Sequence, residues 1–360
     1  MARKRRIQRR KSPRKGISAV DLFCGVGGLT HGFILEGIKV KAGIDIDPWC
    51  QYPYERNNGA RFIKKDIRNL TAKEVKNLYP AGNVKVLAGC APCQPFSTYT
   101  QRYETGGDSN LDLIGVFGRL VQELKPEIVT MENVCRLSKH VVYKTFVQLL
   151  TDLGYHVDSG DVECLGFGVP QTRKRLVLLA SRYGRIALIR YTHGPSRYRT
   201  GRSVIGKLER IKAGEVSGRN PLHRSAGLSP VNAKRIKASK PGACWRNWDE
   251  DLVAECHKEG SGKTYPSVYG RMEWDQPAPT LTTQFYGFGN GRFGHPEQDR
   301  GLSLREGALL QTFPRSYKFV KAGEPIYFKR VGRLIGNAIP VRLARAIAKS
   351  VKLHLEVHRG

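Results

Sequence analysis

The sequence predicts an α/β protein with a doubly wound, mostly parallel sheet and a second, smaller module of irregular structure. Three observations support this prediction. Short β-rich segments alternate with helical segments through the first half of the chain, which is typical of βαβ units. This alternation stops at about residue 185, where Gly, Pro, Ser and Arg become frequent. The length of 360 residues also exceeds that of one average domain.

The predicted elements follow the chain in order. Strands are expected at residues 18–23, 40–46, 60–67, 84–89, 127–133 and 175–181. Helices are expected at residues 29–37, 71–78, 111–125, 142–154, 304–313 and 341–357. The last helix has an apolar stripe, so we expect it to pack on the first domain. In such a sheet, ligands bind at the carboxyl ends of the strands.

Composition divides the chain into three parts. We expect residues 1–16 to form a basic, disordered tail. Residues 17–184 and 320–360 are expected to form the sheet domain, and residues 185–319 the second module. No internal repeat is visible in the sequence.

The formal net charge of +30, from 61 basic and 31 acidic residues, indicates a polyanionic partner, of which the phosphate backbone of nucleic acid is the commonest. Between Arg185 and Lys240 there are 14 Lys or Arg residues and two acids, so this region is the expected nucleic-acid face. The first 15 residues carry nine Lys or Arg and no acid. They are interpreted as an arm that contacts phosphates, with a solvated tail and a nuclear import signal as alternatives.

The eight cysteines have no small-domain spacing, and no apolar stretch follows the N-terminal charges as in a signal peptide. We therefore expect a reducing compartment. No window of the sequence is apolar for long enough to form a membrane helix, so a soluble protein with no membrane contact is expected.

The segment DLFCGVGGLTHGF, residues 21–33, reads as a strand, a glycine-rich turn and a helix. Glycines let backbone amides approach a ligand closely. Because Thr30 stands where a dinucleotide fingerprint has its third glycine, the turn alone is a weak signal, and an NAD site is not excluded. Helix caps and ordinary turn residues are the structural alternative.

Two acids follow the next predicted strands. Asp45 lies about 20 residues beyond Gly25, the separation at which an acid reaches ribose hydroxyls in this architecture, and Asp66 ends the third strand. No Lys or Arg accompanies the glycines to bind a pyrophosphate. A nucleoside-like cofactor such as S-adenosylmethionine fits this pattern best.

Cys93 stands in GCAPCQPFS, in a proline-flanked turn that presents its side chain at the end of the sheet. Three interpretations compete: a redox or metal pair with Cys90, a buried cysteine, and a nucleophile. A redox pair is expected to open a helix, whereas Gln-Pro-Phe-Ser follows here. Zinc needs further ligands, and Cys244, Cys256 and His257 lack a ligand-like spacing with this pair.

The motifs DLFCGVGG, PCQPFS, MENV, QTRKR, PTLTT, LREGALLQTFP and GNAIP occur in an order and spacing that resembles the C5-cytosine DNA methyltransferase family. The resemblance covers residues 18–180 and 277–350. It implies a Rossmann-like, S-adenosylmethionine-dependent methyltransferase domain, with residues 185–319 as a DNA target-recognition domain. PCQ, ENV and QxRxR together form a specific signal.

The chemistry of this family explains the catalytic residues that the resemblance implies. Carbon 5 of cytosine is a poor nucleophile, so a thiolate must first add to carbon 6, and Cys93 is the expected thiolate. Glu132 is expected to protonate or hydrogen-bond ring nitrogen 3, which stabilises the charge of this adduct. Methyl transfer to carbon 5 and loss of its proton then expel the cysteine. The reaction requires no metal.

Arg173 and Arg175 match family positions whose guanidinium groups lie near the base and its phosphate, and a cation can lower the pKa of a thiol. A basic strand end facing solvent is the structural alternative. The target base is covered in a duplex and must be flipped out. Ser97 and the following loop, with Gly106 and Gly107 as a hinge, are expected to close over it.

The resemblance also implies the cofactor contacts, and these surround the methionine, ribose and adenine groups. They are Phe23, Gly25, Gly27, Gly28, Leu29, Asp45, Ile46, Asp66, Ile67, Leu113, Asn337 and Ala338. Two places depart from the family pattern. One is Ile46, where many relatives have an aromatic residue that stacks on adenine, and the other is Cys90-Ala91, where relatives often have glycine and another small or apolar residue.

The predicted function is thus methylation of cytosine carbon 5 in a specific sequence of duplex DNA. The expected protein is monomeric, with a restriction endonuclease as its partner in a restriction-modification system, and is cytoplasmic, or nuclear in a eukaryote. A tRNA methyltransferase of the same fold and a DNA-binding protein without activity are the alternatives. Trp245 and Trp248 either read DNA or anchor a small core.

Overall fold

The computed structural model describes residues 16–92, 112–260 and 262–358. The tail prediction for residues 1–16 and the predictions for Cys93, Ser97, Gly106 and Gly107 therefore fall largely or wholly outside the described residues. No helix within the described ranges is both long and apolar enough to cross a membrane.

A seven-stranded sheet organises the described part of the chain, in the order β3-β2-β1-β4-β5-β7-β6. Its first five strands are parallel, and β7 runs antiparallel to both of its neighbours. The strands are β1 (Ile17–Leu22), β2 (Lys39–Asp45), β3 (Arg61–Lys64), β4 (Val84–Gly89), β5 (Ile128–Asn133), β6 (His156–Glu163) and β7 (Lys174–Ser181). The predicted doubly wound α/β fold is confirmed.

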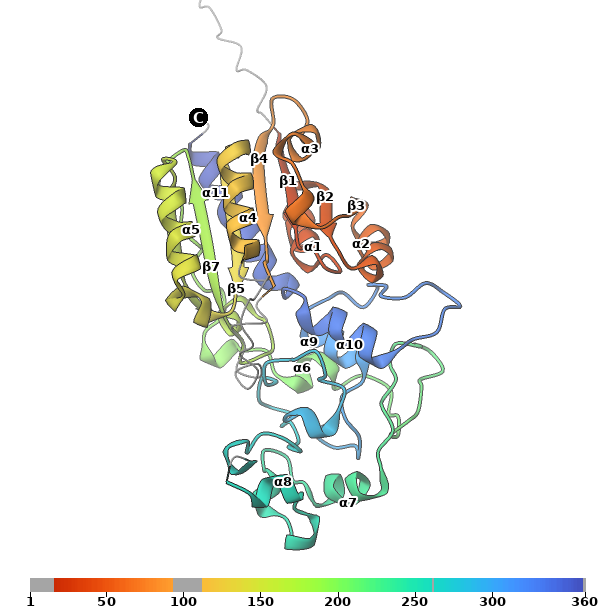
Figure 1. Cartoon of the computed structure of the whole chain (residues 1–360). Helices are drawn as coiled ribbons and strands as arrows, with labels where there is room; N and C mark the ends of the chain where they lie inside the picture. The colour runs from red at the N-terminus through yellow and green to blue at the C-terminus, as the bar shows by residue number, and fades with distance from the viewer. Residues whose placement is uncertain (1–15, 93–111, 261, 359–360) are drawn as a thin grey trace, which may run out of the picture.

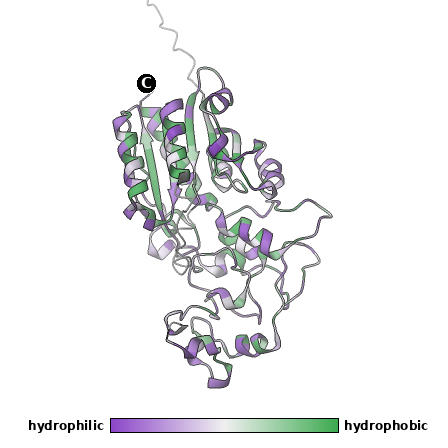
Figure 2. Ribbon diagram, in the orientation of Figure 1, coloured by the Kyte–Doolittle hydropathy of each residue, from purple (hydrophilic) through white to green (hydrophobic). Residues whose placement is uncertain are grey.

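Helices cover both faces of the sheet, as Figure 1 shows. Strand residues alternate between the two faces: Val20 and Leu87 share a core with α4 and α5, whereas Ala19 and Val86 share one with α1 and α11. In Figure 2 the strands and inner helix faces are mostly hydrophobic, as this alternation requires. The helices in these layers are α1 (Gly28–Leu35), α2 (Gln51–Asn58), α3 (Ala72–Asn77), α4 (Asp112–Leu124), α5 (Val141–Asp152) and α11 (Val341–Val357).

The part of the chain between β7 and α11 lies largely below the carboxyl edge of the sheet in Figure 1. It contains short helices joined by long irregular segments, as the sequence predicted. The helices are α6 (Gly201–Ile205), α7 (Pro230–Ala238), α8 (Glu255–Lys258), α9 (Leu304–Leu310) and α10 (Phe328–Asn337).

One hydrophobic cluster joins the two halves. It combines Val26 and Tyr54, which lie beside the sheet, with Phe285, Leu309 and Ile335. This cluster therefore runs across the predicted domain boundary at residues 319 and 320, and α9 and α10 share one core. The exact domain limits stay a prediction.

A smaller core supports the lowest part of the molecule. Trp245 and Trp248 are buried there with Ile236, Val268 and Phe288. The two indole N–H groups donate to the carbonyl of Tyr265 and the hydroxyl of Ser239, respectively. Both tryptophans thus anchor a core, which confirms the structural alternative for these residues.

Candidate active site and cofactor cavity

The glycine-rich turn connects β1 to α1 at the carboxyl edge of the sheet. The Gly25 amide donates to Asp45 Oδ2 at 2.9 Å, which ties the turn to the end of β2. Gly28 is required by a close approach, because a Cβ atom there would lie 2.3 Å from the Ile339 carbonyl oxygen. The turn, the end of β2 and the segment after α10 are thereby brought together.

A cavity of about 390 Å³ opens between these segments. Of the twelve residues predicted to contact the cofactor, eleven line it. They are Phe23, Gly25, Gly28, Leu29, Asp45, Ile46, Asp66, Ile67, Leu113, Asn337 and Ala338. Gly27 does not line the cavity. A Cβ atom at this position would point at Asn58 and Tyr54 instead, and its positive φ of 88° allows α1 to begin there.

The two predicted acids lie at the ends of β2 and β3 in different environments. Burial raises the pKa of Asp45, although the backbone amides of Asp47 and Gly25 donate to its carboxyl group. Hydrogen bonds from Arg68, which include a contact of 3.0 Å between its Nε and Asp66 Oδ2, lower the pKa of Asp66. Ile46 has an exposed fraction of 60 %, so its side chain lies at the open part of the cavity.

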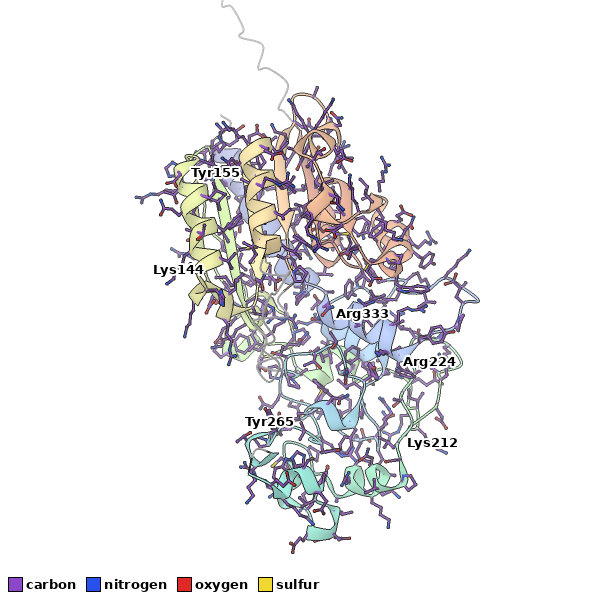
Figure 3. The ribbon with its side chains drawn as sticks, in the orientation of Figure 1. Lys144, Tyr155, Lys212, Arg224, Tyr265 and Arg333 are labelled. Atoms are coloured by element: carbon purple, nitrogen blue, oxygen red, sulfur yellow. The ribbon has the colours of Figure 1, made fainter. Side chains whose placement is uncertain are left out.

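Cations also line the cavity, and sequence reasoning missed them. Arg333, labelled in Figure 3, lies on α10 and forms an ion pair of 2.7 Å with Asp47, the second residue after Asp45. Both side chains line the cavity, as does Arg68. The helical spacing of four residues between Arg333 and Asn337 places both on one face of α10, a signal that the sequence contained.

Glu132 is buried near the end of β5, with an exposed fraction of 4 %. The Cys90 thiol, just beyond β4, donates to Glu132 Oε2 at 3.0 Å. Nε of Arg175, in β7, lies 3.0 Å from Oε1. Three adjacent strands therefore supply one acid, one thiol and one guanidinium group to a single site. Cys90 also lines the cavity, so the acid and the cavity adjoin one another.

Asn133, the residue after the acid, holds the chain that leads to Cys93. Its side-chain Nδ2 donates to the Ala91 carbonyl at 3.0 Å, while its side-chain Oδ1 accepts from the Val134 backbone amide at 2.8 Å. This explains why asparagine follows the acid in the MENV motif, a role that sequence reasoning did not identify. Cys93 and Ser97 themselves lie outside the described ranges.

Arg173 precedes β7 and is buried. It donates to the Leu281 carbonyl at 3.1 Å, so it connects the sheet to the segment that contains PTLTT. Gln171 continues this junction, because its amide group contacts Gln311 and the Leu281 backbone. Gln311 in turn donates to the Ala338 carbonyl, which lines the cavity. The QTRKR motif therefore has two roles: Gln171 and Arg173 connect the sheet to the PTLTT segment, and Arg175 pairs with Glu132.

Four thiols are held in their protonated form by burial, which raises their pKa values. Burial raises the pKa of Cys164 to about 12 despite the nearby charges of Arg173 and Arg175. Burial also raises the pKa values of Cys24 and Cys50, and that of Cys135 to about 11. Such thiols are poor nucleophiles. Within the described ranges, no group of His, Cys, Asp or Glu is arranged to hold a metal ion.

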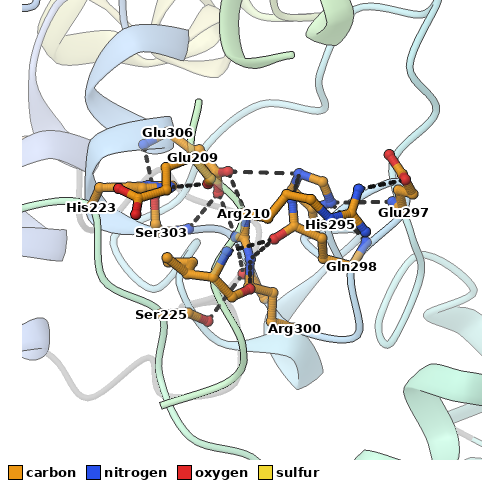
Figure 4. A network of polar contacts seen from close by, with 12 residues as sticks. Glu209, Arg210, His223, Ser225, His295, Glu297, Gln298, Arg300, Ser303 and Glu306 are labelled. Atoms are coloured by element: carbon orange, nitrogen blue, oxygen red, sulfur yellow. Dashed lines mark hydrogen bonds and ion pairs between the residues drawn. The ribbon is translucent and has the colours of Figure 1, made fainter. Parts of the chain in front are cut away.

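Several basic residues beyond residue 185 have structural roles. Arg271 is buried and donates to the carbonyls of Ile236, Ser239 and His295. Arg300 is also buried and donates to both carboxylate oxygens of Glu306 at 2.8 Å, within the polar network of Figure 4. These two side chains are buried and hold neighbouring segments together by hydrogen bonds, so they are not available to contact DNA.

The sheet order, the glycine-rich turn, the acids at the strand ends and the adjoining buried Glu132 together define a Rossmann-like methyltransferase. The family model of the C-5 cytosine-specific DNA methylase matches residues 17–353. The chain belongs to this family and is a DNA (cytosine-5)-methyltransferase, which confirms the resemblance and the function predicted from the sequence.

Two relatives agree with this assignment. The chain is 53% identical over 342 residues to the Type II methylase M.HgiDII of Herpetosiphon aurantiacus, covering 94% of this chain and 96% of that protein. It is 30% identical over 348 residues to the Type II methyltransferase M.Eco47II of Escherichia coli, covering 94% and 79%.

Two solved structures share the fold. A putative DNA modification methyltransferase encoded within a prophage of Escherichia coli matches with a TM-score of 0.71 and 20% identity, covering 95% of this chain and all of that one. DNMT2 of Spodoptera frugiperda matches with a TM-score of 0.63 and 17% identity, covering 94% and 100%. At these identities the likeness concerns the fold alone.

Proposed function

We propose that the enzyme binds S-adenosylmethionine in the cavity at the ends of β1, β2 and β3. The lining fits such a ligand: the partly buried carboxyl group of Asp45 lies where the ribose hydroxyls would bind, and Asp66 and Ile67 lie where adenine would bind. Phe23, Leu29, Asn337 and Ala338 would enclose the methionine part. When bound, S-adenosylmethionine supplies a methyl group carried on a sulfonium ion.

The side chains around Glu132 would perform the chemistry on the base. The Cys93 thiolate adds to carbon 6 of cytosine, and Glu132 donates a proton or hydrogen bond to nitrogen 3, which stabilises the electrons displaced into the ring. Carbon 5 then accepts the methyl group. Loss of its proton restores the ring double bond and expels the Cys93 sulfur.

The observation that carries this proposal is the position of Cys90. Its sulfur contacts Glu132 at 3.0 Å and also lines the cavity. A base held by Glu132 would therefore adjoin the group that donates the methyl. Arg175 pairs with Glu132, and Arg173 is buried beside the junction, so both guanidinium groups would help to hold the base and its phosphate.

The target cytosine would be flipped out of the duplex, because its carbons 5 and 6 are covered by neighbouring bases. Ser97 would contact the flipped nucleotide as its loop closes. The loop and its glycine hinge remain predictions from the sequence.

A group of unpaired cations offers a contact for the DNA backbone. His193 and Nη1 of Arg342 both face Gly168, close to the start of α11. The charges of Arg342, Arg197 and Arg199 reinforce desolvation in lowering the pKa of His193. Within the described ranges, no ion pair is formed by these three arginines, whereas exposed Arg202 and Arg210 pair with acids. Like charges gathered without an acid favour a phosphate as the ligand.

The wider biological setting is also proposed by similarity. We expect residues 185–319 to contain the DNA-reading side chains, since arginine and asparagine can read base edges in the major groove. The Type II names of the relatives support a modification enzyme with a cognate endonuclease, acting on duplex DNA in a bacterial cytoplasm. A monomer is the expected form. Nothing among the comparisons supports a nuclear location.

Methyl transfer from labelled S-adenosylmethionine to duplex DNA and to tRNA tests the substrate. We expect DNA alone to be labelled, and bisulfite sequencing to show one modified cytosine in one recurring sequence. Labelling of tRNA alone would contradict the proposal.

The variant Asp45→Asn tests the cavity. We expect it to raise the KM for S-adenosylmethionine about tenfold, while the KM for DNA stays unchanged, because only the cofactor contact is weakened. An unchanged cofactor KM would remove Asp45 from the binding site.

A further inference from the structure

The carboxyl group of Glu132 has two oxygens in different surroundings. Oε2 accepts the hydrogen bond from the Cys90 thiol at 3.0 Å. Oε1 is buried and has no hydrogen-bond partner within the described ranges. Nε of Arg175 lies 3.0 Å from Oε1, but the contact is an ion pair in which the N–H is not directed at this oxygen.

A buried carboxylate oxygen without a hydrogen bond is costly, so it is expected where a ligand completes the site. Oε1 is therefore the oxygen that remains available for the base. A carboxyl group whose terminal torsion is free would spend part of its time with either oxygen in this place, because that torsion is soft. The thiol contact to Oε2 removes this freedom.

We propose that Cys90 is a positioning residue, whose thiol fixes the orientation of the Glu132 carboxyl group so that Oε1 faces nitrogen 3 of the target cytosine. This inference rests on the proposed role of Glu132 and deepens it. Cys90 contacts the acid and lines the cavity, so it also forms part of the wall between the base site and the cofactor cavity. It takes no part in bond formation.

A packing role predicts a different result from a positioning role. A cysteine that only fills space is replaced about equally well by alanine and by serine, which differ from each other by one hydroxyl group. A donor to Glu132 is replaced by serine, which keeps an O–H group, and is not replaced by alanine. The two variants thus form a matched pair.

The experiment compares wild-type enzyme, Cys90→Ala and Cys90→Ser in steady-state methylation of duplex DNA. We expect Cys90→Ala to lower kcat about tenfold, the usual size of a lost hydrogen bond to a charged group. Its KM values for DNA and S-adenosylmethionine should stay within about twofold. Cys90→Ser should recover at least about half of the lost activity.

Cys135→Ala serves as a control, because the side chain of Cys135 interacts with Asp161 rather than with Glu132. It should leave kcat unchanged. Thermal unfolding of all variants should show that they are folded to the same extent.

Equal kcat values for Cys90→Ala and Cys90→Ser would overturn the inference, as would a loss that appears only in the KM values. These results are distinct from failure of the proposed function, in which wild-type enzyme itself would transfer no methyl group to DNA. An active wild type with equal variants rejects only the role of Cys90.

Discussion

Two buried carboxyl groups, one in each half of the molecule, behave in opposite ways. Asp21, at the end of β1, has an exposed fraction of 2 %, and burial raises its pKa to about 7 against a hydrogen bond from Thr30. Glu306, at the start of α9, is fully buried, yet the charge and hydrogen bonds of Arg300 outweigh burial and lower its pKa to about 2.

The difference is the presence of an arginine partner. In the lower half of the molecule in Figure 1, two buried charges have partners within the protein: Glu306 is paired with Arg300, and Arg271 donates to backbone carbonyls. At the carboxyl edge of the sheet, Asp21 and Asp45 line a cavity and Glu132 keeps one oxygen without a hydrogen bond. The lower half thus uses buried polar groups to hold its own loops, whereas the carboxyl edge of the sheet leaves some of its polar groups available to ligands.

The variant Glu132→Gln tests this comparison with the largest expected effect. If the acid at the sheet edge serves the base, this variant should lower kcat about 10²–10⁴-fold, because an amide cannot donate a proton to nitrogen 3. Loss of the Glu132–Arg175 ion pair should also lower the free energy of unfolding, but by less than the loss of the Arg300–Glu306 pair, because Arg175 is partly exposed whereas Arg300 is fully buried. Single-turnover methylation and chemical unfolding measure the two effects.

Cofactor affinity provides the internal control for this variant. Asp45 and Asp66 are unchanged, so S-adenosylmethionine should bind as it does to wild-type enzyme. A normal methylation rate would show that Glu132 does not have the assigned role.

The opposite pattern is expected for Arg300→Leu in the lower half. Removing one partner of a buried ion pair leaves Glu306 uncompensated, so the free energy of unfolding should fall by about 3–5 kcal/mol. Arg300→Leu combined with Glu306→Leu should recover much of this loss, because neither charge then remains buried. Urea denaturation measures all three proteins.

Arg210→Ala is the matched control, because Arg210 forms an exposed ion pair with Glu297. It should cost less than about 1 kcal/mol. A loss for Arg300→Leu as small as that for Arg210→Ala would contradict the claim that the buried pair organises the lower half.

The raised pKa of Asp21 predicts a pH dependence of stability without cofactor. Between its unfolded value of 3.8 and its folded value of about 7, the folded state binds more protons than the unfolded state. The contribution of Asp21 to stability is therefore full below about pH 4 and is lost as the pH rises through about 7.

Asp21→Asn removes this loss, so the variant should gain up to about 4 kcal/mol over wild type between pH 5 and pH 8. Urea unfolding at both pH values measures the gain. Asp66→Asn is the control, because the pKa of Asp66 is lowered and its carboxyl group titrates below this window. Parallel pH profiles for Asp21→Asn and wild type would reject the account of Asp21.

The smallest effect is expected from deleting residues 1–15. Their nine Lys or Arg residues are interpreted as phosphate contacts, so deletion should weaken DNA binding and reduce its dependence on salt concentration. The same cytosine should still be methylated. A change in the methylated sequence would show that the tail reads bases.

Much of the sheet domain could be predicted because hydrophobic periodicity follows directly from burial on two faces. The strand that the sequence did not predict, β6, lies at the sheet edge, where most of its side chains are exposed and no apolar pattern is required. The helix α10 was not predicted, although Phe328, Val331, Leu334 and Ile335 recur at helical spacing, so its sequence did contain the signal. Its contacts are made across the junction rather than within one domain.

The lower half was harder to predict because its basic residues can have two different roles, binding of nucleic acid and hydrogen bonding to buried groups of the protein. The basic residues near 185–240 were expected to face nucleic acid, and nothing in local sequence distinguishes an arginine that binds phosphate from one such as Arg271 that caps buried carbonyls. Likewise, Arg333 and Cys90 join the site through contacts with segments that are distant in sequence.

The central claim is that Cys93 bonds transiently to cytosine beside the acid of β5. Duplex DNA that carries 5-fluorocytosine at the target position tests this claim most directly, because fluorine cannot leave as the proton does and the adduct persists. With S-adenosylmethionine present, we expect a complex that survives denaturation and maps to Cys93, and none with Cys93→Ser. A methylating enzyme that never forms such a complex in any sequence context would contradict this mechanism.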